Sequence, residues 1–386
     1  MSDQVFLPGS TIGILGSGQL ARMMSQAALP LGYKVVAWSG GADSSAVDRE
    51  VDLVIDSGYD DEAAKEKFLS MVDVVTVETE SLPPALLRDV GSRVELRPNA
   101  KAVETTGTRE LERRFLASID AAQTEFRVVD TVEQLESAFY DLDGNCVAKT
   151  ARDGYDGKGQ WRLKSVEDLE HCKRDWDGRC RLVVEGFIPF IMECSVVVAR
   201  NAAGEVKAFP LVENIHRHHV LDVSILPGRV DEAVAERARV LAEKVIQGLD
   251  YIGILAVELF VLENGEVLVN EIAPRPHNSG HATNDGCVTS QFEQHVRAIC
   301  GLPLGDPRPH GTTVMVNLLS DIWKSDKDAF ADAEIAALTG AKWHFYEKEW
   351  KAGRRKLGHV NFVAATLEEA LSESEKLRGV LFKHVE

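Results

Sequence analysis

A lysine and a cluster of glycines lie close together near the middle of the chain. Lys149 ends a short apolar run, and Gly154, Gly157 and Gly159 follow it closely, with Lys158 among them. Backbone amides in such a loop can surround a polyphosphate and exclude water from it. A lysine at the end of the preceding strand can neutralise phosphate charge. A glycine hairpin exposed to solvent has the same composition, so the loop alone does not decide between these alternatives.

Two glutamates interrupt consecutive apolar segments further along the chain. Glu258 and Glu271 lie in segments that read as strands, and Asn270 directly precedes the second. Buried carboxylates are costly unless cations accompany them. Mg²⁺ is commonly held by one or two carboxylates together with substrate phosphates. Either glutamate alone fits an ordinary ion pair at a strand end, but the pair and the glycine loop together favour a nucleotide site with a divalent cation.

Another glycine motif lies near the N-terminus. Gly16 and Gly18 follow an apolar segment, and with Ala21 they match the dinucleotide pattern G-x-G-x-x-A. Amides at the start of the following helix can hold a phosphate. The acidic residue expected at the end of the second strand is missing, since Asp43 comes only after a pair of glycines. The motif alone leaves three alternatives: NAD binding, a site for another small anion, and a packing turn.

The elements that position these residues form three groups. Apolar segments alternate with helical patterns over residues 11–78, which predicts a doubly wound parallel sheet. Short strands and helices over 124–187 predict a small α+β unit. Longer strands follow over 193–201, 205–216, 255–264 and 266–274, interrupted by a helix over 231–250, and an amphipathic helix is expected over 365–380. The fold class is therefore α/β and α+β, in several domains.

Composition and charge narrow the class of protein. The 386 residues carry a formal net charge of −18, which argues against nucleic acid as a partner. Six scattered cysteines show no metal-type spacing and indicate free thiols in a reducing compartment. The N-terminus does not read as a signal peptide, and no apolar run reaches the length of a membrane span. We therefore expect a cytoplasmic enzyme with no membrane partner.

Four sequence strings resemble those of the N5-carboxyaminoimidazole ribonucleotide synthetase family, which belongs to the ATP-grasp superfamily. The strings are GSGQLARMM, GYDGKGQW, NEIAPRPHNSGH and GRRKLGHVNF. The resemblance covers most of the chain and implies an ATP-grasp fold. It implies a Rossmann-like pre-ATP-grasp domain without NAD over 1–107, a lid domain with its leading helix over 108–190, and a C-terminal ATP-grasp domain with metal and substrate sites over 191–386.

The resemblance also implies a reaction of purine biosynthesis. Members of the family join 5-aminoimidazole ribonucleotide, bicarbonate and ATP, with carboxyphosphate as the intermediate that delivers CO₂ to the amine. The products are N5-carboxyaminoimidazole ribonucleotide, ADP and phosphate. The expected cofactor is Mg²⁺, with Mn²⁺ as a substitute, and the expected assembly is a homodimer.

The roles of individual residues follow from the same resemblance. The expected ATP ligands are Arg109, Lys149, Asp153, Gly154, Tyr155, Gly157, Lys158, Gly159, Glu185, Gly186, Phe187, Ile188, Glu193, His216 and Asn270. Glu258 and Glu271 would hold the metal between the β- and γ-phosphates. The expected catalytic residues are Asp156, Arg275 and Lys356. The expected substrate ligands are Gln19, Leu20, Glu80, Tyr155, His277, Asn278, Ser279, Lys348 and Arg355.

The resemblance assigns chemistry within this set. Glu185 would lie at or near the ribose hydroxyls, with the neighbouring backbone reading adenine. Arg275 would bind bicarbonate or carboxyphosphate through its planar fork. Asp156 would orient the exocyclic amine, and Lys356 would steady the carboxyl group. His295 is expected to be structural, and His281 fits either a structural or a functional role.

Two departures from the family pattern are visible. The basic turn has Ala352 where an arginine is common and Arg354 where a glycine is common, so its phosphate contacts are expected to differ. The segment LASIDAAQTEF, which precedes the lid, lacks the usual proline. Three rival functions stay open: another ATP-grasp ligase, a nucleotide-binding protein without activity, and an NAD-dependent dehydrogenase. Retention of Lys149 and both glutamates disfavours the second, and the missing ribose acid disfavours the third.

Overall fold

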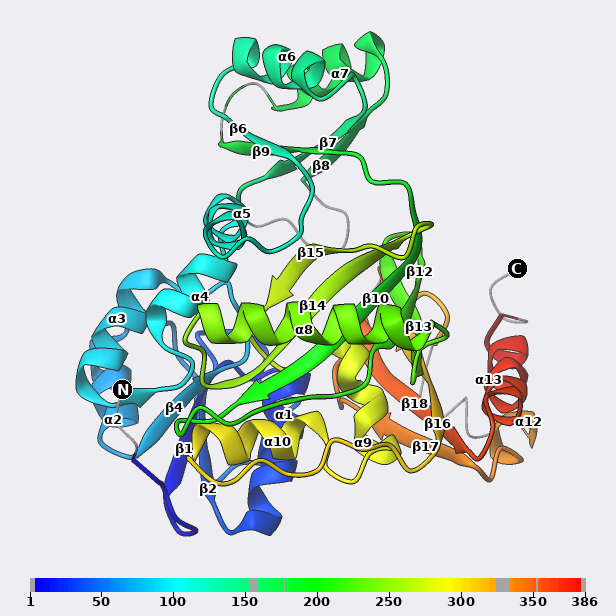
Figure 1. The fold of residues 1–386 in the computed structure, drawn as a ribbon. Helices are drawn as coiled ribbons and strands as arrows, with labels where there is room; N and C mark the ends of the chain where they lie inside the picture. The colour runs from blue at the N-terminus through cyan, green and yellow to red at the C-terminus, as the bar shows by residue number, and fades with distance from the viewer. Residues whose placement is uncertain are drawn as a thin grey trace.

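The strands of the described residues form three sheets, which lie in different parts of the molecule (Figure 1). The computed structural model describes residues 4–152, 159–176, 178, 180–323, 333–351 and 353–382. The expected loop ligands Asp153, Gly154, Tyr155, Asp156, Gly157 and Lys158 lie outside the described residues, as does Ala352. Their roles therefore stay predictions.

The first sheet is parallel and has the strand order β3-β2-β1-β4-β5. Its strands are β1 (Thr11–Leu15), β2 (Lys34–Trp38), β3 (Leu53–Ile55), β4 (Val74–Val77) and β5 (Glu95–Leu96). The helices between them are α1 (Gln19–Ala28), the short 3₁₀ helix η1 (Leu29–Leu31), α2 (Glu62–Leu69) and α3 (Pro84–Arg93). The predicted doubly wound sheet is confirmed.

The strands of this sheet are apolar on both faces because helices cover both faces. Val35 and Ala37 pack against α1, whereas Val36 and Trp38 pack against Phe68 of α2. The first face is also covered by α10 (Gln291–Ile299), which belongs to a much later part of the chain. The N-terminal unit is therefore closed by a helix from the C-terminal half, and Figure 1 shows α1 and α10 side by side.

The second sheet is antiparallel, has the order β6-β9-β7-β8, and lies at the top of Figure 1, in the unit that the sequence predicts to be the lid and that keeps this name below. Its strands are β6 (Phe126–Val129), β7 (Cys146–Thr150), β8 (Gln160–Leu163) and β9 (Leu182–Gly186). Two helices cover its outer face, α6 (Val132–Asp141) and α7 (Val166–Trp176). Helix α6 begins with a capping box between Thr131 and Gln134, which satisfies two of its free amides. The expected small α+β unit is confirmed.

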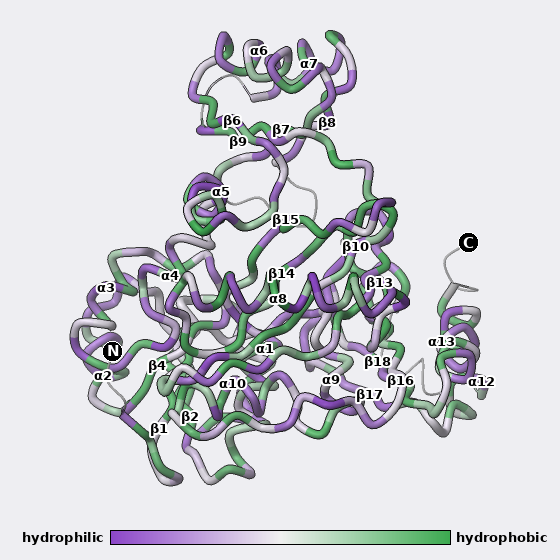
Figure 2. The backbone as a smooth tube through the Cα atoms, in the orientation of Figure 1, coloured by the Kyte–Doolittle hydropathy of each residue, from purple (hydrophilic) through white to green (hydrophobic). Residues whose placement is uncertain are grey.

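The third sheet follows the path β15-β14-β10-β12-β13-β16-β18-β17, with β11 paired to β10. Its strands are β10 (Phe190–Arg200), β11 (Val206–Ala208), β12 (Val212–Arg217), β13 (Val220–Leu226), β14 (Gly253–Leu262), β15 (Val267–Ala273), β16 (Thr312–Leu319), β17 (Ala341–Phe345) and β18 (Lys356–Ala364). Its remaining associated helices are α8 (Glu232–Gly248), η2 (Asn278–Ala282), α9 (Thr283–Gly286), α12 (Ala333–Ala336) and α13 (Leu367–Phe382). Figure 2 shows hydrophobic residues along β14 in the middle of the molecule.

Two sequence expectations need correction or extension here. The single strand expected over 205–216 is wrong, because β11 and β12 are separate strands with Pro210 between them. Proline cannot donate to a strand ladder, so it ends β11. The sequence does not predict the pairing of β16, β17 and β18 with the earlier strands, and this pairing makes one continuous sheet of the C-terminal half.

Helices α4 (Ala100–Thr106) and α5 (Arg109–Ser118) connect the first sheet to the lid. Among the described residues, no helix combines the length and the apolar character that a membrane crossing requires.

The fully buried side chain of His295 ties the first sheet to the third. Its Nε2 lies 2.8 Å from Thr76 Oγ1 on β4, and its Nδ1 accepts a hydrogen bond of 3.1 Å from the amide of Ile254 on β14. Burial lowers the pKa of His295 to about 3. The ring is therefore neutral in the folded protein at neutral pH, in agreement with the structural role expected for it.

We predict that acidification destabilises the fold partly through His295. An unfolded histidine binds a proton near pH 6.5, whereas folded His295 does not until about pH 3, so stability is lost as the pH falls below about 6.5. The expected loss approaches about 1.4 kcal/mol per pH unit for this residue. Urea denaturation at pH 7, 6 and 5 measures it. His295→Gln should flatten the dependence, whereas His171→Gln, at an exposed histidine, serves as the control; equal slopes in all three proteins would contradict the prediction.

Candidate active site

Three of the expected ATP ligands meet at the base of the lid. Arg109 is the first residue of α5, Lys149 lies on β7, and Glu185 lies on the adjacent strand β9. Arg109 pairs with Glu185 through two bonds, Nε to Oε1 at 2.8 Å and Nη2 to Oε2 at 3.0 Å. Lys149 Nζ lies 2.9 Å from the same Oε2. Two cations therefore enclose the carboxylate of Glu185, which is 4% exposed, and both of them can also bind phosphate.

The charges of this cluster are strongly coupled. Burial alone would raise the pKa of Glu185, but Arg109, Lys149 and Arg113 hold it well below its usual range. Burial and the neighbouring Arg109 charge lower the pKa of Lys149, and Glu185 offsets this only in part. Both oxygens of Glu185 are used by the cations in this structure, so its expected contact with the ribose stays a prediction.

Arg109 also connects the lid to the third sheet. Its Nη1 lies 3.3 Å from Glu271 Oε2, and its Nη2 donates to the carbonyl of Asn270 at 3.2 Å. Its own backbone amide donates to Ala151 O at 2.9 Å, close to the expected glycine loop. The Arg109 side chain therefore contacts the lid at Glu185 and the predicted metal-binding strand at Asn270 and Glu271.

Glu258 and Glu271 face each other on β14 and β15. They are direct partners in the antiparallel register. Burial would raise the pKa of Glu258, but His277, with Nε2 3.0 Å from Glu258 Oε1, and His216 lower it. Partial burial and the neighbouring Glu258 charge raise the pKa of Glu271 above its usual range. Two mutually repelling carboxylates form a donor set that suits a divalent cation.

A metal at this pair would need further ligands. Among the described residues, no group of three or more His, Cys, Asp or Glu side chains is arranged to hold a metal ion. Mg²⁺ typically keeps waters and binds phosphate oxygens in addition to one or two carboxylates. The pair therefore fits Mg²⁺ bound together with a nucleotide better than it fits a metal held by protein alone.

Glu193 and His216 form a third part of the expected ATP site. They lie on the adjacent strands β10 and β12, and His216 Nδ1 contacts Glu193 Oε2. Burial would lower the pKa of His216, but Glu193 and then Glu258 raise it above its usual value. The expected adenine-binding segment, Gly186 to Ile188, links β9 to β10, and the Phe187 ring stacks under the Arg162 guanidinium at 3.8 Å.

The segment from His277 to Ser279 lies beside Glu258. Besides its contact with Glu258, His277 has Nδ1 2.9 Å from Ser279 Oγ, which in turn lies 2.7 Å from the buried Ser195 Oγ. Asn278 is 7% exposed, and neither of its amide atoms has a partner among the described residues. A buried amide without partners is costly, so Asn278 is well suited to bind a polar ligand.

Arg275 pairs with Glu80 across the boundary between the first and third sheets. Arg275 Nε lies 2.5 Å from Glu80 Oε2, and Nη2 lies 3.1 Å from Oε1. Burial would raise the pKa of Glu80, but Arg275 lowers it. The structure thus brings together two residues that the sequence assigned separately to the catalytic and the substrate-binding groups.

The expected ribonucleotide ligands lie between α1 and the segment before β18. Lys348 Nζ donates to Gln19 Oε1, and Arg355 Nη2 lies 2.8 Å from Asp43 Oδ2. Burial lowers the pKa of Lys348 to about 8, with Glu78 opposing the shift. The basic residues therefore face the N-terminal unit, and the fold brings Gln19 and Lys348, far apart in sequence, into contact.

Lys356 is the first residue of β18, and its charge affects the pKa of two other side chains. It opposes the rise in the pKa of His216 and adds to the lowering of the pKa of Lys348. Arg354, the departure from the family pattern, donates to the carbonyls of Arg217 (3.2 Å) and His218 (2.7 Å). Arg354 therefore fastens the turn to the end of β12.

Sequence reasoning missed Glu78, which fills the helix N-terminus of the first glycine motif. Glu78 Oε2 accepts from the Gly18 amide at 2.6 Å, and Oε1 accepts from the Leu20 amide at 3.1 Å. A Cβ on Gly16 or Gly18 would come within 2.5 Å of this carboxylate. The amides expected to be free for a phosphate are thus already used, and of the three alternatives the packing turn is the one the structure shows. The only sequence signal was an acid directly after the apolar strand β4.

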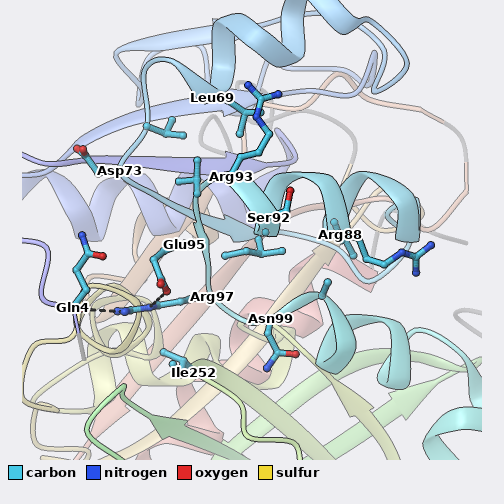
Figure 3. Close-up of a pocket in the computed structure, with 16 residues that line it drawn as sticks. Gln4, Leu69, Asp73, Arg88, Ser92, Arg93, Glu95, Arg97, Asn99 and Ile252 are labelled. Atoms are coloured by element: carbon cyan, nitrogen blue, oxygen red, sulfur yellow. Dashed lines mark hydrogen bonds and ion pairs between the residues drawn. The ribbon is translucent and has the colours of Figure 1, made fainter. Parts of the chain in front are cut away.

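A separate pocket, drawn in Figure 3, lies on α3 and β5 away from these residues. It has a volume of about 930 Å³, and Arg97, Asn99 and Ile252 are among its lining residues. None of the sequence-predicted site residues lines it. We therefore place the candidate active site at the convergence of the lid, the third sheet and α1.

Comparison with known proteins identifies the class first. Residues 10–106 match the ribonucleotide synthetase preATP-grasp domain, residues 114–292 match the ATP-grasp domain, and residues 313–373 match the phosphoribosylaminoimidazole carboxylase C-terminal domain. The chain is therefore an ATP-grasp protein with a preATP-grasp domain, as the sequence predicted.

Individual relatives identify the family. The chain is 39% identical to N5-carboxyaminoimidazole ribonucleotide synthase of Bacillus subtilis, over 97% of this chain and 96% of the relative. It is similar to the ADP complex of an N5-carboxyaminoimidazole ribonucleotide synthetase (TM-score 0.92, 38% identity, 99% of both chains). It is also similar to the Aspergillus clavatus enzyme in complex with ADP and 5-aminoimidazole ribonucleotide (TM-score 0.87, 27% identity, 97% of this chain and 99% of the other). The chain belongs to the N5-carboxyaminoimidazole ribonucleotide synthetase family.

We predict that Gly18→Ala destabilises the N-terminal unit. The new methyl group would meet Glu78 Oε1 at 2.5 Å and displace the carboxylate that caps α1, at a cost of about 1–3 kcal/mol. Urea denaturation measures the change in the free energy of unfolding. Gly379→Ala is the matched control, because it adds a methyl group with no neighbour within 4 Å inside helix α13 and should be neutral or stabilising. Equal stability of the two variants would contradict the assigned contact.

Proposed function

We propose that the chain carboxylates 5-aminoimidazole ribonucleotide to N5-carboxyaminoimidazole ribonucleotide with ATP and bicarbonate, giving ADP and phosphate. Membership of the family and the relative bound to ADP and 5-aminoimidazole ribonucleotide support this activity. One observation carries the proposal within this chain: Arg109 contacts both Glu185 beside Lys149 and Glu271 opposite Glu258. Phosphate-binding cations and a metal-type carboxylate pair thus form a single site.

In this proposal ATP lies between the lid and the third sheet. Arg109 and Lys149 bind its phosphates together with the loop from Asp153 to Gly159, and Glu258 and Glu271 hold Mg²⁺ or Mn²⁺. The bound cation would neutralise charge on the β- and γ-phosphates. Phosphates competing for Arg109 and Lys149 would release Glu185 from its present contacts, and this exchange would free Glu185 to approach the ribose. The remaining proposed nucleotide ligands are Gly186, Phe187, Ile188, Glu193, His216 and Asn270.

Arg275 and its neighbours are proposed to bind bicarbonate. A bicarbonate oxygen attacks the γ-phosphorus, the bond to the β-phosphate oxygen breaks, and ADP leaves with carboxyphosphate formed. The Arg275 guanidinium suits a planar carboxyl group. His277, Asn278 and Ser279 line the same place, and the unpartnered amide of Asn278 supports a role in binding the intermediate. Enclosure of the site would protect carboxyphosphate from water.

The ribonucleotide is proposed to bind between α1 and β18. Gln19, Leu20, Lys348 and Arg355 would hold its phosphate and ribose, with Glu80 near Arg275. Carboxyphosphate releases CO₂ and phosphate, the exocyclic amine attacks the carbon of CO₂, and the amine loses a proton. Asp156 and Tyr155 would orient the amine from the loop, and Lys356 would steady the new carboxylate. Lys356 directly follows Arg355 at the start of β18, and its charge acts on both His216 and Lys348, which supports this role.

We also propose the finer organisation that the resemblance implied. The domain boundaries at 107/108 and 190/191, the homodimer and the cytoplasmic location stay part of this proposal. The matched preATP-grasp region, which ends at residue 106, supports the first boundary. Size-exclusion chromatography with light scattering tests the homodimer.

The function is tested by measuring phosphate release from ATP with Mg²⁺. We expect release that needs both bicarbonate and 5-aminoimidazole ribonucleotide, and that falls about 100- to 1,000-fold in Glu271→Gln, because a lost metal ligand removes several kcal/mol of transition-state stabilisation. Glu266→Gln, at an exposed position just before β15, is the matched control and should keep wild-type activity.

Two outcomes would contradict the function. Release with bicarbonate alone, indifferent to the ribonucleotide and to Lys356→Ala, would indicate an ATP-grasp enzyme with another acceptor. ATP binding without release under any condition would indicate a nucleotide-binding protein without this activity.

We predict that ribonucleotide binding weakens above pH 8 through Lys348. Its pKa is lowered to about 8, so the ammonium that would pair with the substrate phosphate is lost as the pH rises through this value. Above pH 8, kcat/KM for the ribonucleotide should fall up to about 10-fold per pH unit, with little change in kcat. Lys348→Arg should remove this limb of the profile, because arginine keeps its charge. An unchanged profile in Lys348→Arg would contradict the assignment.

A further inference from the structure

Two buried residues of α5 are directed at the strand that carries Glu271. Glu112 and Arg113 are 1% and 0% exposed, and Arg113 Nη2 lies 2.8 Å from Glu112 Oε1. Neither residue belongs to the site that the sequence predicted. Their other polar contacts include the backbone of β15, where Glu271 lies.

Glu112 and Arg113 pair with the outer edge of β15 much as a neighbouring strand would. Glu112 Oε2 accepts a hydrogen bond of 2.8 Å from the Ile272 amide. Arg113 donates from Nη1 to the Val269 carbonyl at 3.2 Å and from Nη2 to the Asn270 carbonyl. In the sheet formed by the described residues, β15 is an edge strand. Edge strands have backbone groups without strand partners, and here Glu112 and Arg113, together with Arg109 at the start of α5, supply partners.

The contacts of Glu112 and Arg113 surround a β-bulge. Glu258 pairs with Glu271, but Leu259 pairs with Val269, so Asn270 is an extra residue in β15. In a regular strand, two residues three positions apart point to opposite faces of the sheet. Val269 and Ile272 nevertheless pack into the same hydrophobic core, because the extra residue lies between them. A bulge changes the direction of the side chains beside it. The bulge at Asn270 therefore determines how Glu271 faces Glu258.

We propose that Glu112 and Arg113 are positioning residues that fix this bulge and hold Glu271 opposite Glu258 for a divalent cation. The inference rests on the proposed function, because it requires a metal at this pair. The Arg113 fork reaches two carbonyls at once, a geometry that a lysine ammonium does not reproduce. Residues that orient metal ligands typically change metal affinity by about 10- to 100-fold when replaced.

Arg113→Lys tests the role directly. Mn²⁺ is titrated into the full-length protein in the presence of ADP, and free Mn²⁺ is measured by electron paramagnetic resonance. We expect the Kd for Mn²⁺ to rise about 10-fold or more, with the KM for the ribonucleotide unchanged. Glu112→Gln keeps an oxygen acceptor for the Ile272 amide, so it should give a smaller increase and provides a second, milder variant.

Arg97→Lys is the matched control for lost stability. Arg97 is another arginine at 1% exposure, and it donates to the carbonyls of Ile299 (2.8 Å) and Gln4 (3.1 Å) rather than to β15. Figure 3 shows its contact with Gln4. This variant should lower the melting temperature and leave Mn²⁺ affinity unchanged. If Arg113→Lys likewise lowers only the melting temperature, the positioning role is overturned.

Glu271→Gln separates the two levels of the proposal. Weaker Mn²⁺ binding in Glu271→Gln together with wild-type affinity in Arg113→Lys would overturn the positioning role and leave the metal site in place. Unchanged Mn²⁺ binding in Glu271→Gln would overturn the proposed metal site, and the role of Glu112 and Arg113 with it. Weaker binding in both, with Arg97→Lys unaffected, is the expected result.

Discussion

The placement of Arg109 links the parts of the candidate site. Its guanidinium is shared between Glu185 of the lid and Glu271 of the large sheet, and its own helix joins the lid to the N-terminal unit. A buried cation is stable only with compensating charge, and both acids serve this purpose. The lid can therefore lie against the sheet without leaving Arg109 or Glu185 uncompensated. An incoming polyphosphate offers the same negative charge, so the cations that compensate Glu185 and Glu271 are also suited to bind the phosphates of a nucleotide.

Because the chain as a whole is acidic, the cations of the candidate site stand out as the place where an anionic substrate can bind. The chain has a net charge of −18, so its surface as a whole repels anions. An anionic substrate is therefore attracted mainly to places where several cations lie close together. Arg109, Lys149, Arg275 and Lys348 each lie beside an acid or amide of a different element. These pairings keep each cation in place. They also make the geometry of the candidate site depend on how the three sheets pack against one another.

Much of the fold was readable from the sequence because its signals are local. Alternating strands and helices, the glycine motifs and the apolar strands carrying Glu258 and Glu271 all report on nearby residues. The pairing of Arg275 with Glu80 was not readable, although both residues were singled out, because it depends on contact between distant sheets. The sequence does not single out Glu112 and Arg113, because charged side chains on an amphipathic helix usually face solvent. Their function as partners for an edge strand emerges only once β15 has a position.

The side chain of Glu78 has a consequence for selectivity among nucleotides. The N-terminal unit retains the strand, glycine turn and helix that bind dinucleotides in other proteins, but its helix amides are satisfied by the chain's own carboxylate. An intramolecular anion does not dissociate into solution, so the amides of Gly18 and Leu20 stay satisfied by the chain itself. The glycine turn before α1 therefore does not offer the phosphate site that it provides in dinucleotide-binding proteins, and a dinucleotide has no docking point at this helix N-terminus.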